Sequence, residues 1–233
     1  MCSLTSLTLM RFTGAARIWM MTQMAFARPA LRRIPGLRFW KLLGVGDGFS
    51  LRPDLGAYGL LAVWASSECA DAFFDGAPVM RRFRRHADEV WTVRMVVIQS
   101  RGAWSGINPF RPVASPDGGP LCVLTRATIR WRRLAAFWSH VPDINRTLVG
   151  VPGLVLSVGI GEAPVARQAT FSLWRSDADM RAFAYRQPAH AEAIRCARNE
   201  SWYAEDLFVR FKPLSAEGTW RSDEPLARAR DAE

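Results

Sequence analysis

The sequence predicts an α+β fold made of two tandem ferredoxin-like βαββαβ repeats, fused into one compact domain. Three observations support this fold class. The composition is that of a globular protein, because 49% of the 233 residues are hydrophobic and only 22% are charged. The chain also contains an internal repeat, and each copy shows strand and helix patterns in the same order. The length is sufficient for a substantial core.

The internal repeat has a period of about 110 residues. An apolar run ends at Trp64 in YGLLAVW, and a similar run ends at Trp174 in QATFSLW. Each run is followed by polar residues and then by an amphipathic stretch. Four pairs of landmarks occur in the same order in both copies: Trp64 and Trp174, Phe73 and Phe183, Trp91 and Trp202, and the IPGL at 34–37 and the VPGL at 151–154. This order favours a duplication over chance similarity.

The first copy reads as strand, helix, strand, strand, helix, strand. Alternating apolar residues predict strands, apolar residues at helical spacing predict helices, and Pro35-Gly36 predicts a turn. Gly76-Ala77-Pro78 is expected to interrupt the second helix. In order, the expected elements are a strand at 4–12, a helix at 15–31, strands at 38–44 and 58–64, a helix at 68–88 and a strand at 91–99.

The second copy repeats this order, which is the split βαβ pattern. One sheet covered by helices on a single face needs cover for its other face. Two such units can therefore stack sheet on sheet or join edges into a barrel wrapped by four helices. In order, the expected elements are a strand at 121–129, a helix at 133–148, strands at 155–159 and 169–174, a helix at 178–197 broken near Pro188, and a strand at 206–211.

The predicted boundaries follow from these patterns. The first repeat covers 1–103 and the second covers 121–221. Between them, the proline- and glycine-rich segment 104–120 is expected to be a linker. The polar segment 222–233 is expected to be a disordered tail.

Composition also excludes several classes of protein. The four cysteines lie far apart without a CxxC pair, which favours neither a zinc site nor a disulfide scaffold and makes a reducing cytoplasm the expected location. No signal peptide is expected, and the most apolar stretch, 18–30, contains Thr22, Gln23 and Arg28. The sequence therefore predicts a soluble protein.

The net charge is +10, and 29 of the 31 basic residues are arginine. The arginines are scattered except for the cluster at 81–85, and no RRM, helix-turn-helix or zinc-finger pattern is present, so no nucleic-acid partner is expected. The positive charge alone fits a basic face that rests on anionic lipid headgroups as well as it fits nucleic-acid binding, and it establishes neither.

Catalytic motifs such as GxSxG, a P-loop, HExxH and GxGxxG at a helix start are missing. Among the three histidines, His140 falls outside the apolar stripe of its helix, and His86 lies on a stripe with Val79 and Phe83. His190 lies on a stripe with Ala193 and is expected to face the sheet. A neutral imidazole in that position could bind a haem iron, or it could be a core histidine that is hydrogen-bonded to a carbonyl.

The chain resembles the spheroidene monooxygenases, the ketolases of bacterial carotenoid biosynthesis. The resemblance covers about residues 4–220. It is carried by Arg11-Phe12, Phe39-Trp40-Lys41, LAVW at 61–64, LTRAT at 124–128, VGIGE at 158–162, TFSLW at 170–174, HAEAIR at 190–195 and the segment 202–211.

This resemblance implies a haem-dependent monooxygenase that puts a keto group on an acyclic carotenoid of the spheroidene type, using O₂ and reduced ferredoxin. Two oxidations of one carbon would give a geminal diol that loses water. The resemblance also implies a fold like that of the dimeric α/β barrels, built here within one chain. The expected partners are a lipophilic carotenoid, a ferredoxin and, peripherally, a membrane surface.

The resemblance also implies roles for three residues. His190 is the expected axial ligand of the haem iron, whereas His86 lies outside the matching strings. Lys41 and Arg126 are expected to bind the haem propionates, with a role as solvated surface cations as the alternative. No side chain is assigned a catalytic role beyond the haem.

Two other functions remain open at this stage. One is a cofactor-free or haem-degrading monooxygenase of the same barrel superfamily, which differs in whether haem copurifies and survives turnover. The other is a non-catalytic carrier of haem or a lipophilic ligand, which would bind without forming an oxygen-dependent product.

Overall fold

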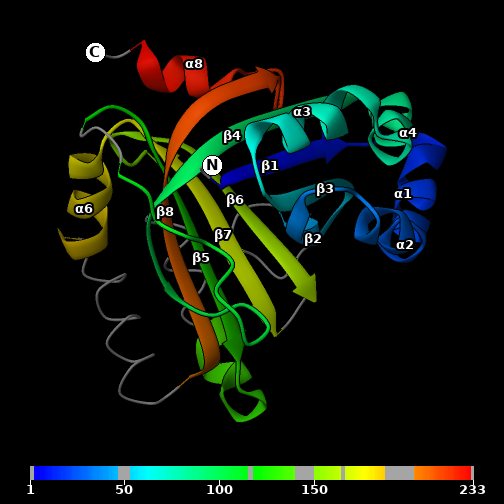
Figure 1. The fold of residues 1–233 in the computed structure, drawn as a ribbon. Helices are drawn as coiled ribbons and strands as arrows, with labels where there is room; N and C mark the ends of the chain where they lie inside the picture. Colours follow the sequence, from blue (N-terminus) through cyan, green and yellow to red (C-terminus); the bar gives the residue numbers. More distant parts are fainter. Residues whose placement is uncertain are drawn as a thin grey trace.

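In the computed structural model of the chain, the described residues form eight β-strands that close into an antiparallel barrel (Figure 1). The structure describes residues 3–46, 53–114, 118–139, 150–163, 166–186 and 202–231. Around the barrel the strands follow the order β1-β3-β2-β6-β7-β5-β8-β4, and β4 pairs back with β1. The expected α+β class is confirmed, and of the two expected arrangements the barrel is the one observed.

The strands are β1 (Leu4–Arg11), β2 (Leu37–Gly46), β3 (Pro53–Trp64), β4 (Glu89–Gly102), β5 (Leu121–Ile129), β6 (Leu154–Ala163), β7 (Arg167–Trp174) and β8 (Tyr203–Gly218). The helices are α1 (Gly14–Phe26), α2 (Arg28–Arg32), α3 (Ser67–Gly76), α4 (Pro78–His86), α6 (Asp177–Arg186) and α8 (Pro225–Arg230), with a 3₁₀ turn, η1 (Trp131–Arg133). Among the described helices, none combines the length and the hydrophobicity that crossing a bilayer requires.

The local signals in the first half of the sequence place its helices well. The expected break at Gly76-Ala77-Pro78 separates α3 from α4, because Pro78 begins α4 at a position where its missing N–H is not needed. Ser66 caps α3 by accepting a hydrogen bond from the backbone N–H of Cys69. The expected helix at 15–31 is divided into α1 and α2 by Ala27, directly before the Arg28-Pro29 pair that opens α2.

In the second half, the expected strands are all present, and β5 has the bounds that were predicted. The two expected helices are described only in part. Residues 134–139 are helical, and 140–149 lie outside the described residues. The helix expected at 178–197 begins as α6, and 187–201 lie outside the described residues, His190 among them.

Two seams join the first four strands to the last four. The β4–β8 seam is long, with Trp91 opposite Gly218 at one end and Gly102 opposite Leu207 at the other. The β2–β6 seam has three register pairs, of which two are glycine–glycine: Gly44↔Gly161, Val45↔Ile160 and Gly46↔Gly159.

Inward-facing side chains fill the barrel. Strand alternation turns every second residue inward, for example Leu7 and Leu9 on β1 and Val209 and Phe211 on β8. Large aromatic side chains complete the filling, and Trp104 and Phe110 come from the segment expected to be only a linker. This segment closes one end of the barrel, so it contributes to the core as well as connecting the halves.

The tail after residue 222, expected to be disordered, instead forms helix α8 over the other end of the barrel (Figure 1). Leu226 and Ala229 are 3% and 2% exposed and join the core inside the barrel. These two apolar residues are three positions apart, so both lie on one face of the helix and turn to the barrel while the charged residues remain outside.

Candidate functional site

A cluster of two cations and two carboxylates lies at the end of the barrel closed by Trp104. It brings together Lys41 from β2, Arg126 from β5, Glu162 from β6 and Glu205 from β8. The Lys41 ammonium donates to Glu162 Oε1 at 2.6 Å and to Ser105 Oγ at 3.0 Å. The cluster therefore joins both halves of the barrel.

Arg126 holds the second half of this cluster. Its guanidinium pairs with Glu205 and lies 3.8 Å from Glu162 Oε2. Only 3% of the Arg126 side chain is exposed, so its alternative role as a solvated surface cation is wrong. Trp104 donates its indole N–H to Glu162 Oε2 at 2.8 Å, and the Lys41 and Arg126 cations lie 5.6 Å from its ring centroid.

The carboxylates remain charged in this environment. Burial alone would raise the pKa of Glu162, but hydrogen bonds from Lys41 and Trp104 and the charges of Lys41 and Arg126 together lower it. For Glu205, burial is likewise outweighed by backbone hydrogen bonds from Gly106 and Ser105 and by Arg126, and its pKa is also lowered. The two positive charges of the cluster are thus balanced by two negative ones.

Lys41 and Arg126 were predicted as propionate partners, and the structure places both next to Glu162. Each already has a carboxylate partner inside the barrel. Their partners could not be identified from the sequence, because Glu162 follows Lys41 by 121 residues and only a closed barrel brings them together. A propionate-binding role for either cation stays a prediction.

The outer faces of the two sheet halves differ in cover. On β1, Thr8 is fully buried beneath the helices and its hydroxyl lies 3.0 Å from that of Thr92. On β5, Thr125 lies between the inward-facing Leu124 and Arg126, and is therefore on the outer face. Thr125 is exposed. The outer face of the second half is thus accessible at a central strand.

The neighbours of Thr125 on the adjacent strands extend this outer surface. Thr170 on β7 and Phe208 on β8 lie opposite Thr125 in the two strand ladders, and both are half-buried. The Arg101 guanidinium lies 5.3 Å from the Phe208 ring centroid. We call Thr125, Thr170 and Phe208 the open face. It presents two hydroxyls and an aromatic ring, a surface suited to a flat apolar group with a cation at its edge.

Of the three histidines, the structure describes only His86. Its ring stacks on Trp19 of α1 with the centroids 3.9 Å apart, and its Nδ1 lies 2.9 Å from the carbonyl oxygen of Arg82. His86 therefore packs against Trp19 of the neighbouring helix, although its stripe with Val79 and Phe83 had indicated a side chain that faces the sheet. His140 and His190 lie outside the described residues. Within the described ranges, no three His, Cys, Asp or Glu side chains come together to hold a metal ion.

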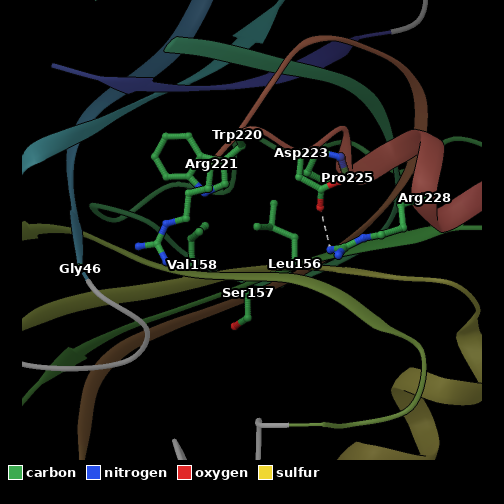
Figure 2. Close-up of a pocket in the computed structure, with 9 residues that line it drawn as sticks. All are labelled: Gly46, Leu156, Ser157, Val158, Trp220, Arg221, Asp223, Pro225 and Arg228. Carbon is green, nitrogen blue, oxygen red and sulfur yellow. Dashed lines mark ion pairs between the residues drawn. The ribbon is translucent and has the colours of Figure 1, made fainter. Parts of the chain in front are cut away.

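A small pocket of about 190 Å³ lies between the start of β6 and the segment around α8 (Figure 2). Leu156 and Val158 extend toward Trp220, Ser157 points the other way, and Asp223 pairs with Arg228 at 3.0 Å (Figure 2). Ligand sites for drug-sized molecules usually measure about 300–1,000 Å³, so this pocket is too small for a carotenoid or a haem. This pocket is therefore not a candidate site for either molecule.

Comparison with known proteins connects this architecture to a family. No family model matches the chain. The solved structure of an aldoxime dehydratase is similar in fold, with a TM-score of 0.63 at 12% identity, covering 91% of this chain and 81% of the dehydratase. A second aldoxime dehydratase structure, in complex with butyraldoxime, has a TM-score of 0.60 at 11% identity, covering 93% and 82%. At these identities the likeness concerns the fold alone.

Sequence relatives are much more similar. The spheroidene monooxygenase of Rhodobacter capsulatus is 39% identical over 228 residues, which is 95% of either chain. That of Rubrivivax gelatinosus is 40% identical over 218 residues, covering 92% of this chain and 84% of the relative. That of Cereibacter sphaeroides is 33% identical over 229 residues, covering 96% and 71%. The chain belongs to the spheroidene monooxygenase family and is a monooxygenase.

Proposed function

We propose that this monooxygenase is haem-dependent and introduces a keto group into an acyclic carotenoid of the spheroidene type. The observation that carries the proposal is the 39% identity to a spheroidene monooxygenase over 95% of both chains. Agreement over nearly the full length means that both halves of the barrel, the open face and the cluster around Glu162 fall within the matched region.

The open face supports a flat cofactor on the outside of the second half. The barrel interior is filled with side chains, so a large planar group requires an outer face. Thr125, Thr170 and Phe208 offer an accessible surface on central strands, whereas Thr8 on the other sheet half is buried. A bound haem would supply the activated oxygen that attack on an unactivated C–H bond requires. The open face would orient it and exclude water from one side.

His190 is the proposed axial ligand. It belongs to one of the strings that carry the resemblance described above, and its predicted helix would follow α6, which packs on the second half of the sheet through Met180 and Phe183. Lys41 and Arg126 remain the proposed propionate partners. Both side chains face the inside of the barrel, whereas the open face lies outside it. Either could take this role only by leaving Glu162 or Glu205 and reaching the cofactor around the end of the barrel.

Two tandem ferredoxin-like repeats are the proposed origin of the barrel. Strand order supports this, since the first half runs β4-β1-β3-β2 and the second runs β8-β5-β7-β6. Trp64 and Trp174 both end the third strand of their half, and each donates its indole N–H to a serine at 2.9 Å. Repeats at 1–103 and 121–221 account for both observations.

Reduced ferredoxin is the proposed electron donor, with O₂ as the oxidant. The net charge of +10 supports association with an acidic redox protein, because opposite charge steers such encounters.

The proposal is tested by absorption spectroscopy followed by a product assay. Protein produced with a haem precursor should show a Soret band that shifts on reduction with dithionite and again with carbon monoxide. With spheroidene, O₂ and reduced ferredoxin it should then form the ketone. A featureless visible spectrum after addition of haem would refute the cofactor. A Soret band without a ketone product would refute the substrate.

A further inference from the structure

Helix α1 is apolar on both sides. Its inner side, with Met20 buried and Trp19 and Met24 partly buried, packs on the first half of the barrel. Its outer side leaves Ile18 and Phe26 69% and 74% exposed, and Met21 50% exposed. A helix that is hydrophobic all round is normally covered on all sides, by protein or by lipid.

The segment that contains α1 and α2 carries charges of one sign. Residues 1–46 contain seven basic residues and no aspartate or glutamate. Arg28, Arg32 and Arg33, at the start and end of α2, are exposed. Arg28 donates its Nε–H to the carbonyl oxygen of Met24. None of these three arginines forms an ion pair with a carboxylate in the described part of the chain.

Helix α4 extends this basic surface. It lies beside α1 (Figure 1), where Trp19 stacks on His86 at 3.9 Å and meets Phe83 edge-on at 6.3 Å. While Phe83 turns inward, the arginines of α4 turn outward. All four, Arg81, Arg82, Arg84 and Arg85, are exposed, and Arg84 donates to the carbonyl oxygen of Phe74.

We infer that this surface, made of the outer side of α1 and the exposed arginines of α2 and α4, docks on an anionic lipid bilayer. Ile18, Met21 and Phe26 lie along one side of a single helix, so they can enter the boundary between headgroups and acyl chains together. The surrounding arginines then lie at the level of the lipid phosphates, where each adds to the attraction.

The charge pattern favours lipid over a second copy of the chain. Two such surfaces face to face would bring Arg28, Arg32 and Arg33 of both copies together, and like charges across an interface repel. A bilayer supplies both an apolar layer and a dense layer of anions. Docking goes beyond the proposed function and is tested without a carotenoid, so the two can fail separately.

The test is sedimentation of the full-length protein with vesicles. One set contains equal parts phosphatidylglycerol and phosphatidylcholine, and the other contains phosphatidylcholine alone. We expect binding to the anionic vesicles to be about tenfold stronger than to the neutral ones, and to fall steeply when the salt is raised to about 0.5 M. Equal binding to both vesicles, or no binding to either, would overturn the inference.

Variants locate the surface. The double variant Ile18→Glu with Phe26→Glu should bind anionic vesicles about tenfold more weakly, since two charged groups would have to enter the boundary region. Leu214→Glu, at a residue that is 50% exposed on β8, is the matched control and should bind like the wild type. Equal loss in the control and the double variant would show that the surface is wrongly placed.

Two further measurements separate folding and self-association from docking. The Arg32→Gln, Arg33→Gln double variant keeps the apolar residues and should also bind anionic vesicles more weakly, which secures the test if the glutamate variant misfolds. Analytical ultracentrifugation without lipid measures the oligomeric state of the wild type and of the glutamate variant. Docking on lipid would be refuted if the wild type formed a dimer, the Ile18→Glu, Phe26→Glu variant remained monomeric, and the wild type did not bind vesicles. The occupant of the surface would then be a second copy of the chain.

Discussion

Glu162 accepts a hydrogen bond from the Lys41 ammonium with one carboxylate oxygen and from the Trp104 indole with the other, at 2.6 and 2.8 Å. These three side chains come from β6, from β2 and from the segment between the two halves. The carboxylate therefore connects three parts of the chain that are far apart in sequence, at the end of the barrel closed by Trp104.

Removing the indole N–H should weaken this end of the barrel. Trp104→Phe keeps an aromatic ring in the core but leaves Glu162 Oε2 without its closest donor. We expect a loss of about 1–3 kcal/mol in the free energy of unfolding. Urea denaturation measures it, with Trp131→Phe at an exposed position as the control. Equal stability of both variants would contradict the role assigned to the indole.

The lowered pKa of Glu162 makes part of the stability depend on pH. Its ionised form is favoured by folding, so its contribution is complete above the ordinary glutamate value of 4.5 and is lost as the pH falls through the folded value. Glu162→Gln should therefore be less stable than the wild type at about pH 7, and the difference should shrink below about pH 4.5. Unfolding free energies measured across this range test the sign. A difference that grows on acidification would contradict it.

A larger side chain on the open face should interfere with binding of the proposed cofactor. Thr125→Trp should lower haem loading about tenfold, because the indole would occupy the open face, on which the cofactor is proposed to lie. The fold should be unaffected, because Thr125 is exposed. Thr22→Trp, at an exposed position on α1, is the matched control and should load normally. Haem loading is measured as the Soret absorbance per chain. Full loading of Thr125→Trp would contradict a cofactor position on the open face.

Histidine variants test the axial ligand. His190→Ala should abolish or greatly reduce haem loading, whereas His86→Ala and His140→Ala should retain it. For His86 the structure gives a reason, because its ring is stacked on Trp19 in the helical layer of the first half. Full loading of the His190 variant would remove this residue from the site and leave the fold unaffected.

Helix α8 should stabilise the barrel. Leu226→Ala removes a buried side chain from the core and should cost about 2–5 kcal/mol. Leu214→Ala, at a half-exposed position, should change stability by less than about 0.5 kcal/mol. If thermal unfolding found the two variants equally stable, the segment would be the disordered tail that its composition suggests.

The sequence predicted the order of the strands well because the signals for it are local or periodic. The repeat around Trp64 and Trp174 indicated the order of strands and helices along the chain, and Pro78 marked the start of α4. The tail was misjudged because Leu226 and Ala229 are two apolar residues in a charged segment. Only the open end of the barrel, built by distant strands, provides the apolar surface that orders them.

The candidate site was predicted less completely. Lys41 and Arg126 were singled out, but the carboxylates that hold them were not. A contact across 121 residues, such as Lys41 to Glu162, depends on barrel closure and leaves no trace in the local pattern. The open face was missed for a similar reason. Thr125 resembles Thr8 in the sequence, and its local pattern does not distinguish an exposed threonine from a buried one.

The contrast between Thr8 and Thr125 has a consequence for symmetry. In a dimer of identical subunits, every substitution appears twice, so a face that is opened for a ligand is opened in both copies. A single chain is free of this constraint. One outer face can stay covered, as at Thr8, while the other stays accessible, as at Thr125, so the proposed cofactor should bind once per chain.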